Sequence, residues 1–195
     1  MPRPRTFDEA QVLEGAVDLF RERGFDGASV PEITERLGIC RQSLYSTFGD
    51  KRGLFLKALE RYGQREVDAK LAVLVDGDSP LESVRTVLRG LAAMATQCPS
   101  EGCLTVTALV ESREDADAVQ VIEAQVERLE GGFRDALGRA QVAGELRADA
   151  RPERLARMLI TSFYGIGVLC RLPSSSQRIA DAVSTLLELV DDAAA

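Results

Sequence analysis

Residues 29–48, SVPEITERLGICRQSLYSTF, predict two short helices joined by a tight turn. Ser29 stands at the N-cap of the first helix, with Pro31 in its first turn and Glu32 at the spacing of a capping box. Gly38 follows at the position where a left-handed residue best ends a helix. The spacing therefore predicts a helix that begins and ends within this stretch, followed at once by a second one.

The second helix, residues 41–47, is mostly polar. Leu44 is its buried position, and Ile39 fills the corner between the two helices. Its outward positions are Arg41, Gln42, Ser43, Ser46 and Thr47. A polar face of this width fits the major groove of a DNA duplex. The stretch is typical of a helix-turn-helix whose second helix is the recognition element.

Residues on both sides of this unit extend the pattern from Phe20 to Leu54. Together they read F-x-x-x-G-F-x-x-x-S-V-x-x-I-x-x-x-L-G-I-x-x-x-S-L-Y-x-x-F-x-x-K-x-x-L. This pattern resembles the amino-terminal DNA-binding domain of the TetR family of bacterial regulators, with its AcrR-like members. The match covers about a third of the chain, and its spacing has few competitors.

The resemblance implies an all-α fold of about nine helices. Residues 1–50 are expected to form a three-helix, TetR-type helix-turn-helix domain, and residues 51–195 a helical ligand-binding and dimerisation domain. It further implies a dimeric repressor that leaves a palindromic operator when a small molecule binds the second domain. The expected partners are double-stranded operator DNA, a second copy of the chain and an unknown small-molecule effector, with no cofactor.

The side chains of the second helix suggest separate roles in DNA binding. Arg41 suits guanine O6 and N7, and Gln42 suits adenine N6 and N7, so these two are expected to read bases. Phosphate contacts are expected from the hydroxyls of Ser43, Tyr45 and Thr47 and from the charge of Lys51. By the resemblance, Tyr45, Lys51 and Ser29 occupy positions that meet the DNA backbone in relatives.

Two positions depart from the family pattern. Position 40 is usually a Ser or Thr that caps the recognition helix, and Cys40 is a poorer acceptor, which predicts a looser helix start or one that depends on the thiol state. Position 47 is often a His or Tyr that touches phosphate in the family. Thr47 is shorter, so the contact expected there is in question.

The charge of −7 is unevenly distributed along the chain. Residues 1–65 carry 11 Lys/Arg and 10 Asp/Glu, whereas residues 66–195 carry 13 and 21. Five bases lie between positions 36 and 57 against the single acid Asp50: Arg36, Arg41, Lys51, Arg52 and Lys57. This local basic surface attracts phosphate while the acidic remainder repels it. The arm with Arg3 and Arg5 is expected either to reach DNA or to make no contact.

The composition excludes several classes of protein. Histidine is absent, which removes the commonest general base, the histidine-containing catalytic triads and histidine metal sites. The four cysteines, Cys40, Cys98, Cys103 and Cys170, lack CxxC spacing, so no metal site is expected. Without histidine, a Gly-rich phosphate loop or paired metal carboxylates, no reaction is indicated, so the protein is not expected to be an enzyme. No apolar run is long enough to span a bilayer and no signal peptide is indicated, so we expect a cytoplasmic protein.

Helical periodicity continues outside the DNA-binding unit. The expected helices cover residues 7–23, 51–75, 81–96, 104–111, 115–142, 152–171 and 178–190. Gly131 and Gly132 interrupt a good helix pattern, which indicates close packing or a bend at that place. The last two helices are apolar on more than one face, as a four-helix dimer interface requires. The residues predicted for that interface are Leu155, Leu159, Ile166, Ile179, Val183, Leu186 and Val190.

A largely apolar effector cavity is predicted in the body. Its candidate lining residues are Met94, Cys103, Val106, Leu109, Phe133, Phe163 and Tyr164. Few charges lie at these positions, so a neutral or lipophilic ligand is expected. Each of these side chains is also a plausible plain core residue. The residues leave open the identity of the ligand, the operator sequence, the regulated genes, and whether the protein represses or activates.

Two alternatives remain open. The segment CPSEGC, residues 98–103, places Cys98 and Cys103 five positions apart, and Cys103 begins a helix whose dipole lowers a thiol pKa, so the pair is a candidate sensor of oxidants or electrophiles. The other reading is that both cysteines are small core residues. A helical interaction protein that has lost DNA binding is the second alternative, favoured by the substitutions at Cys40 and Thr47.

Overall fold

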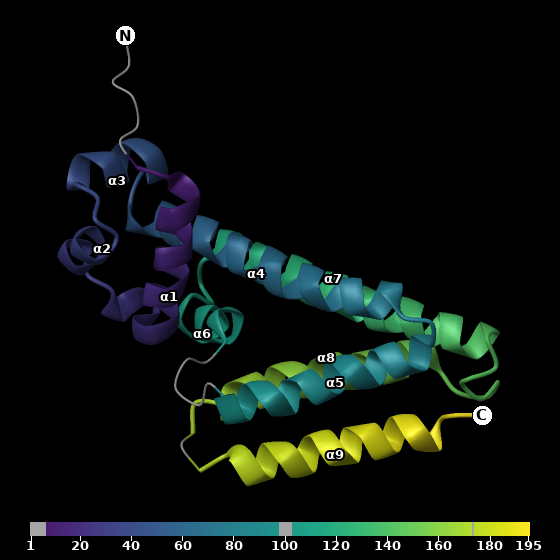
Figure 1. The fold of residues 1–195 in the computed structure, drawn as a ribbon. Helices are drawn as coiled ribbons and strands as arrows, with labels where there is room; N and C mark the ends of the chain where they lie inside the picture. Colours follow the sequence, from purple (N-terminus) through teal and green to yellow (C-terminus); the bar gives the residue numbers. More distant parts are fainter. Residues whose placement is uncertain (1–6, 98–102, 173) are drawn as a thin grey trace. The chain divides into compact units, whose positions relative to one another are not determined.

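This computed structural model describes residues 7–97, 103–172 and 174–195, and for residues 94–97 it describes the backbone alone. The described residues form nine α-helices (Figure 1). They are α1 (Glu9–Gly27), α2 (Val30–Arg36), α3 (Arg41–Phe48), α4 (Lys51–Asp76), α5 (Pro80–Gln97), α6 (Leu104–Glu111), α7 (Ala116–Val142), α8 (Pro152–Leu169) and α9 (Ser176–Asp192). The predicted all-α fold is confirmed. Among the described residues, none of the helices is long and apolar enough to cross a membrane.

The helix ends lie close to their predicted positions, and local caps explain the differences. The first helix begins at Glu9 rather than Phe7, because the Asp8 carboxylate accepts a hydrogen bond from the Ala10 amide at 2.9 Å. The Asp115 carboxylate likewise accepts from the amide of Ala118 at 3.2 Å, and α7 begins one residue later than predicted. Shifts of one or two residues are ordinary at frayed helix ends.

The chain divides into two compact units. One comprises Met1–Gln64 and Cys103–Ile122, and the other comprises Arg65–Gly102 and Glu123–Ala195. Helix α6 therefore belongs to the same unit as α1, α2 and α3, and α4 and α7 each contribute to both units. The boundary predicted at residue 50 separates a DNA-binding domain from a ligand-binding domain, which is a division by function and not by compactness. It stays a prediction.

The core of the first unit is built around phenylalanine rings. Phe20 of α1 meets Phe55 of α4 edge-on, with ring centroids 5.1 Å apart. Phe25 lies against the same Phe55 ring at 4.9 Å. Leu44 and Ile33 are fully buried and fasten the two short helices to this core. The rigidity of the helix-turn-helix therefore depends on packing against α1 and the start of α4.

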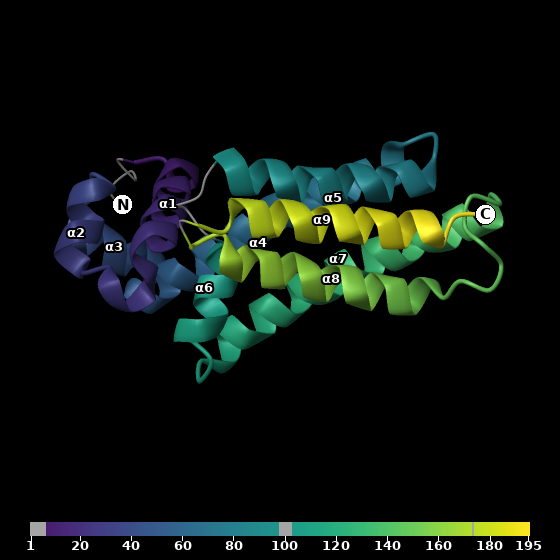
Figure 2. The same ribbon diagram turned by 90° about the horizontal axis from the view of Figure 1, so that it is seen from below.

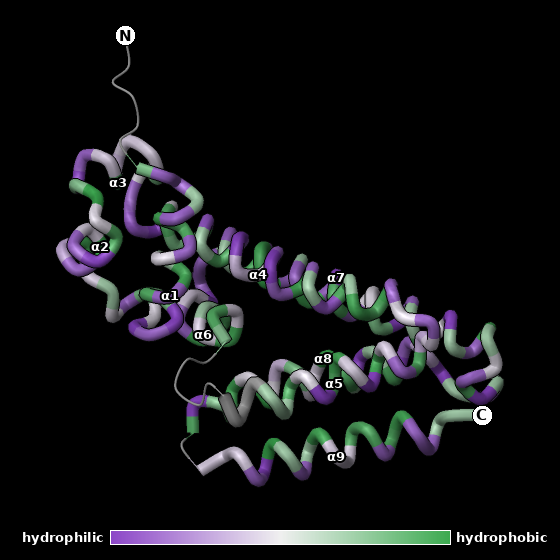
Figure 3. The backbone as a smooth tube through the Cα atoms, viewed as in Figure 1, coloured by the Kyte–Doolittle hydropathy of each residue, from purple (hydrophilic) through white to green (hydrophobic). Residues whose placement is uncertain are grey.

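The core of the second unit includes most of the side chains predicted for a dimer interface. Helix α9 lies along α5 and α8 (Figures 1 and 2), and apolar and polar stretches alternate along it (Figure 3). The residues of that set that are buried within the single chain are Leu159, Ile166, Ile179, Val183, Leu186 and Val190. The half-buried Leu155 packs against the same core. The principal apolar face of α9 is thus covered within one protomer, and the dimer contact of these residues stays a prediction.

Gly132 marks a close approach of two helices in the second unit. A Cβ at this position would lie 2.3 Å from Leu71 Cδ2 and 3.3 Å from Leu74 Cδ1, so α4 and α7 pack closely there and a larger residue would displace the leucine side chains. The neighbouring Gly131 has no comparable contact, since its nearest atom is in the flexible side chain of Arg134 at 3.7 Å. The predicted close packing is thus confirmed at the second glycine of the pair.

Candidate nucleic-acid interface

Helix α2 begins with half of the predicted capping box. The Ser29 hydroxyl accepts a hydrogen bond from the Glu32 amide at 3.3 Å. The Glu32 carboxylate accepts instead from Arg23 Nε of α1, at 3.1 Å. Glu32 therefore ties the start of α2 to α1, a contact between residues nine positions apart that the capping-box spacing alone did not predict.

The turn between α2 and α3 has the predicted glycine conformation. Gly38 adopts a φ of 64°, and the Ile39 amide donates to the Thr34 carbonyl at 3.1 Å. Ile39 is only 7% exposed, as expected for the residue that fills the corner. A residue with a Cβ would be strained at position 38, so this glycine fixes the angle at which α3 leaves the turn.

Cys40 caps α3 despite being an unusual residue for that role. Its sulfur accepts a hydrogen bond from the Ser43 amide at 3.4 Å and lies 3.2 Å from the Ser43 hydroxyl. These contacts from Ser43 lower the pKa of the exposed Cys40 thiol. The predicted weak cap is therefore present as a sulfur cap, and its strength is expected to follow the thiol state.

Helix α3 has one buried and one exposed side. Leu44 and Phe48 are buried, whereas Arg41 and Gln42 are exposed and Tyr45 is 50% exposed. Ser43 and Thr47 are half-buried, and the Ser46 hydroxyl donates to the Ser43 carbonyl at 3.2 Å. The side chains best placed to contact a ligand are therefore those of the first turn and of Tyr45.

Most basic side chains near α3 are already paired with carboxylates. Arg36 donates to Glu22 at 2.6 Å, and this pairing holds the pKa of the Glu22 carboxyl below its ordinary value. Arg52 binds Asp115 through two hydrogen bonds of 2.6 Å each. No sequence pattern indicated this second pair, because its members lie 63 residues apart.

Arg41 and Lys51 differ from these paired residues. Within residues 7–64 as described, Arg41 is exposed and has no carboxylate partner. Lys51 is half-buried, with its Nζ 4.5 Å from the centre of the Phe25 ring. The basic surface predicted from five residues is thus centred on Arg41 and Lys51, since Lys57 also pairs with Glu9 at 3.4 Å.

Two family descriptions match separate stretches of this chain. "Bacterial regulatory proteins, tetR family" matches residues 12–58, and "Tetracyclin repressor-like, C-terminal domain" matches residues 80–186. The chain is also 32% identical over 194 residues to the uncharacterized HTH-type transcriptional regulator YezE of Bacillus subtilis (strain 168), covering 98% of this chain and 100% of YezE. This chain is a TetR-family transcriptional regulator.

Other TetR-family proteins resemble it over nearly the whole length. The HTH-type transcriptional repressor ComR of Escherichia coli (strain K12) is 26% identical over 96% of this chain and 90% of ComR. A cysteine mutant of the TetR-family regulator CifR, complexed with 26bp double-strand operator DNA, superimposes with a TM-score of 0.84 at 32% identity, covering 95% of this chain and 98% of CifR. Membership of a family of DNA-binding regulators agrees with the expectation that the protein is not an enzyme.

The predicted effector pocket of this TetR-family regulator falls on both compact units. Cys103, Val106 and Leu109 belong to the first unit, and the remaining described residues to the second. Leu109 is 50% exposed, so it is not enclosed as a pocket residue would be. The rings of Phe163 and Tyr164 meet edge-on at 5.5 Å and pack against the same core as the buried Phe133. The side chain of Met94 lies outside the described residues, and the pocket stays a prediction.

The cysteines of the described part of the chain lie in different surroundings. Cys40 is exposed, whereas Cys103 and Cys170 are half-buried. Cys103 stands at the N-cap of α6 without a side-chain capping bond. Cys98 lies outside the described residues, as do Arg3 and Arg5, so the thiol pair and the basic arm remain predictions. In residues 7–97, 103–172 and 174–195, no group of His, Cys, Asp or Glu is arranged to hold a metal ion.

The lowered thiol pKa predicts that Cys40 is the most reactive of these cysteines. At about pH 7, iodoacetamide is expected to alkylate Cys40 faster than the half-buried Cys103 and Cys170, and faster than a cysteine in an unstructured peptide. Peptide mapping by mass spectrometry gives the individual rates. Ser43→Ala removes the hydroxyl that lies 3.2 Å from the sulfur and is expected to slow the reaction. An unchanged rate in that variant would show that the Ser43 hydroxyl does not activate the thiol, since the variant keeps the Ser43 amide.

Proposed function

We propose that this TetR-family regulator is a homodimeric repressor that binds a palindromic operator through α3 and is released by a small, mostly apolar ligand. The observation that carries the proposal is the first turn of α3, where Arg41 and Gln42 are exposed and Arg41 has no carboxylate partner within residues 7–64 as described. Two relatives, ComR and BdcR of Escherichia coli (strain K12), are named as transcriptional repressors. Binding to chromosomal DNA would place the protein in the cytoplasm.

Within this proposal the DNA-binding residues of α3 and its neighbours divide into two groups. Arg41 and Gln42 read base edges in the major groove, where each bidentate contact discriminates against a wrong base by about 1–3 kcal/mol. The phosphate contacts come from Ser29, Ser43, Tyr45, Thr47 and Lys51. Because Ser43 and Thr47 are half-buried, Tyr45 and Lys51 are expected to contribute most to positioning on the duplex.

Binding of wild-type protein to DNA that flanks its own coding region tests the proposal. In a mobility-shift assay at about 150 mM salt, we expect a complex that survives an excess of shuffled duplex. Equal competition by the shuffled and flanking sequences would favour the alternative, a helical interaction protein without selective DNA binding.

The proposed dimer contact lies on the outer surface of α8 and α9. A groove of about 460 Å³ runs between them, lined by Ser162, Gly165, Ile166, Leu169, Ala182, Thr185 and Leu186. Its side chains are small or apolar, so helices of a second copy can approach closely. Exposed Leu189 and Val168 extend the apolar surface of the same helices. Of the residues predicted for the interface, Ile166 and Leu186 line this groove, whereas Leu159, Ile179, Val183 and Val190 lie in the protomer's own core.

Gly165→Arg is expected to convert the dimer into a monomer. A Cβ at Gly165 meets no atom within 4 Å, so the substitution leaves the protomer's own packing intact while placing a charge in the groove. Gly90→Arg is the matched control, because Gly90 is an exposed helical glycine of α5 with the same free space. Sedimentation equilibrium should show monomers for the first variant and dimers for the second. A dimeric Gly165→Arg protein would place the interface elsewhere.

The effector part of the proposal is supported by the aromatic cluster of the second unit. Phe133 is buried and Phe163 and Tyr164 are half-buried, which offers an apolar surface for a neutral ligand. Release of labelled operator by a panel of apolar compounds tests this part. Compounds that bind the wild type but not a Phe163→Ala variant would identify the site.

A thiol sensor built on Cys98 and Cys103 is the second candidate for the signal. It is favoured by the position of Cys103 at the N-cap of an α-helix, where its side chain makes no capping bond. The reactive Cys40 would confuse a simple oxidation test, so the measurement uses a Cys40→Ser background. Operator affinity that stays constant while peroxide modifies Cys98 and Cys103 would end this alternative.

A further inference from the structure

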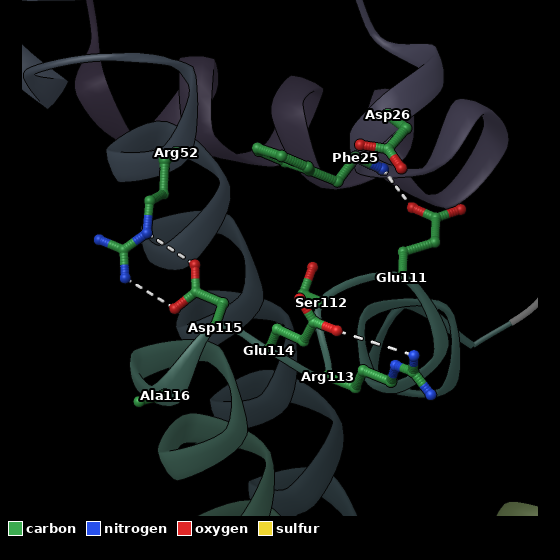
Figure 4. A pocket seen from close by; sticks show the side chains of 9 residues that line it. All are labelled: Phe25, Asp26, Arg52, Glu111, Ser112, Arg113, Glu114, Asp115 and Ala116. Atoms are coloured by element: carbon green, nitrogen blue, oxygen red, sulfur yellow. Dashed lines mark hydrogen bonds and ion pairs between the residues drawn. The ribbon is translucent and has the colours of Figure 1, made fainter.

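Helix α1 is interrupted at Gly24, and the break leaves a backbone donor to be satisfied. Gly24 adopts φ 72° and ψ 179°, outside the helical region. The amide of Phe25 instead donates to the Glu111 carboxylate at 2.6 Å, across 86 residues of sequence (Figure 4). Both residues belong to the first compact unit. The Glu111 carboxylate gives this amide a charged acceptor in place of a helical carbonyl, and so stabilises this backbone conformation.

The Glu111 carboxylate lies directly against position 24. A Cβ on Gly24 would lie 2.2 Å from one carboxylate oxygen of Glu111 and 2.5 Å from the other. Glycine suits this position because of its positive φ, and a larger residue would displace the Glu111 carboxylate from the Phe25 amide. The last residue of α6 fits directly against the backbone of α1.

Phe25 connects this contact to the residues proposed to bind DNA. Its amide is held by Glu111, while its ring packs on Phe55 and lies 4.5 Å from Lys51 Nζ. The cation–π contact restricts where the Lys51 ammonium can lie. The backbone that leaves Phe25 also leads within four residues to Ser29, the N-cap of α2. Fixing Phe25 thus fixes two of the proposed phosphate contacts.

A second contact fastens the same segment to α4. Arg52, beside Lys51, binds Asp115 through two hydrogen bonds and Asp117 through a third, each of 2.6 Å. The segment from Glu111 to Asp115 lines an open cleft of about 640 Å³, with Phe25 and Arg52 on its other side (Figure 4). The link between α6 and α7 is therefore attached to α1 at one end, through Phe25, and to α4 at the other, through Arg52.

We propose that Glu111 is a positioning residue for operator binding, which acts by holding the Phe25 amide at the Gly24 break and thereby placing Lys51 and Ser29 against the phosphates. This inference rests on the proposed function, since it assumes that those two residues contact DNA. It adds a residue of α6, outside the helix-turn-helix, to the set that determines operator affinity. For this role the side chain of residue 111 must be long enough to reach the Phe25 amide, and its charge matters less.

Two conservative variants separate reach from charge. Glu111→Gln keeps an oxygen that can accept from Phe25 and removes the charge, whereas Glu111→Asp keeps the charge and withdraws the acceptor by one methylene. In an anisotropy titration with labelled operator, we expect Glu111→Asp to lose affinity by about tenfold and Glu111→Gln to stay within about threefold of wild type. Since the charged Lys51 contact is weakened once in each protomer, the slope of log K against log salt should fall by up to about 1 per protomer for Glu111→Asp.

Glu114→Ala is the matched control. It removes the same charge from the same segment, and the Glu114 side chain is 88% exposed and pairs with Arg113 at 3.7 Å. Its affinity is expected to equal that of wild type. Circular dichroism at the titration temperature verifies that every variant is folded.

A double-mutant cycle with Lys51→Met completes the test. If Glu111 acts through Lys51, Glu111→Asp should cost less affinity in the Lys51→Met background than in wild type. Equal losses in both backgrounds, or a Glu111→Gln variant as weak as Glu111→Asp, would overturn the inference while leaving the proposed function standing. A wild-type protein that binds no duplex selectively would overturn both.

Discussion

Replacing Arg41 and Gln42 together with alanine is expected to lower affinity for the operator by on the order of 100-fold or more. Both side chains are exposed in the first turn of α3, the part of a recognition helix that reaches base edges. Because each dimer carries the pair twice, the loss applies to both half-sites. Fluorescence anisotropy with labelled operator measures it, and competition with shuffled duplex measures the accompanying loss of selectivity.

The control for this variant removes the same two residue types elsewhere. Gln64→Ala/Arg65→Ala changes an exposed Gln and an exposed Arg in the middle of α4, away from α3 in the sequence. Its operator affinity should remain within about threefold of wild type, because surface substitutions away from an interface have small effects. If the double variant of Arg41 and Gln42 bound its operator as tightly and selectively as this control, the assignment of base readout to α3 would be wrong.

Phe55→Ala is expected to destabilise the protein by about 3–5 kcal/mol. Phe55 is 1% exposed and its ring contacts those of Phe20 and Phe25, so truncation leaves a cavity in the middle of the first unit. Urea unfolding followed by circular dichroism measures the change in free energy. Since Phe20, Phe25 and Phe55 join α1 to α4, operator affinity should fall in the same variant.

Tyr45→Ala provides the contrast on stability. Tyr45 is 50% exposed on α3, and its removal should change the free energy of unfolding by no more than about 0.5 kcal/mol while weakening operator binding. The Phe55 variant thus tests the stability of the fold, and the Tyr45 variant tests operator binding. A loss below about 1 kcal/mol for Phe55→Ala would mean that the phenylalanine cluster does not carry the stability of this unit.

The positions of the helices could be predicted because the sequence signals that determine them act over a few residues. Apolar spacing, Gly38 and the polar first turn of α3 all act within a few residues, and the structure places helices where that spacing predicts them. Cys40 was predicted to be a weak cap from its residue type alone. The structure adds a contact that this prediction did not include, between the Cys40 sulfur and the hydroxyl of Ser43, three residues later. The position of the N-cap of α3, residue 40, was nevertheless predicted from the sequence.

The contacts that orient the helix-turn-helix were not predictable from one sequence. Arg52 and Asp115 are 63 residues apart, and Phe25 and Glu111 are 86 apart, so no periodicity connects them. Periodicity also identifies an apolar face without naming what covers it. For this reason Val183 and Val190 were predicted to meet a partner copy, whereas the structure buries them within one protomer.

The central claim, that two copies of α3 read one operator, is tested most directly by a hydroxyl-radical footprint of the flanking DNA combined with the stoichiometry of the complex. We expect two protected regions about one helical turn apart and two protomers per duplex. Protection that ignores sequence, or a complex containing a single protomer, would contradict it.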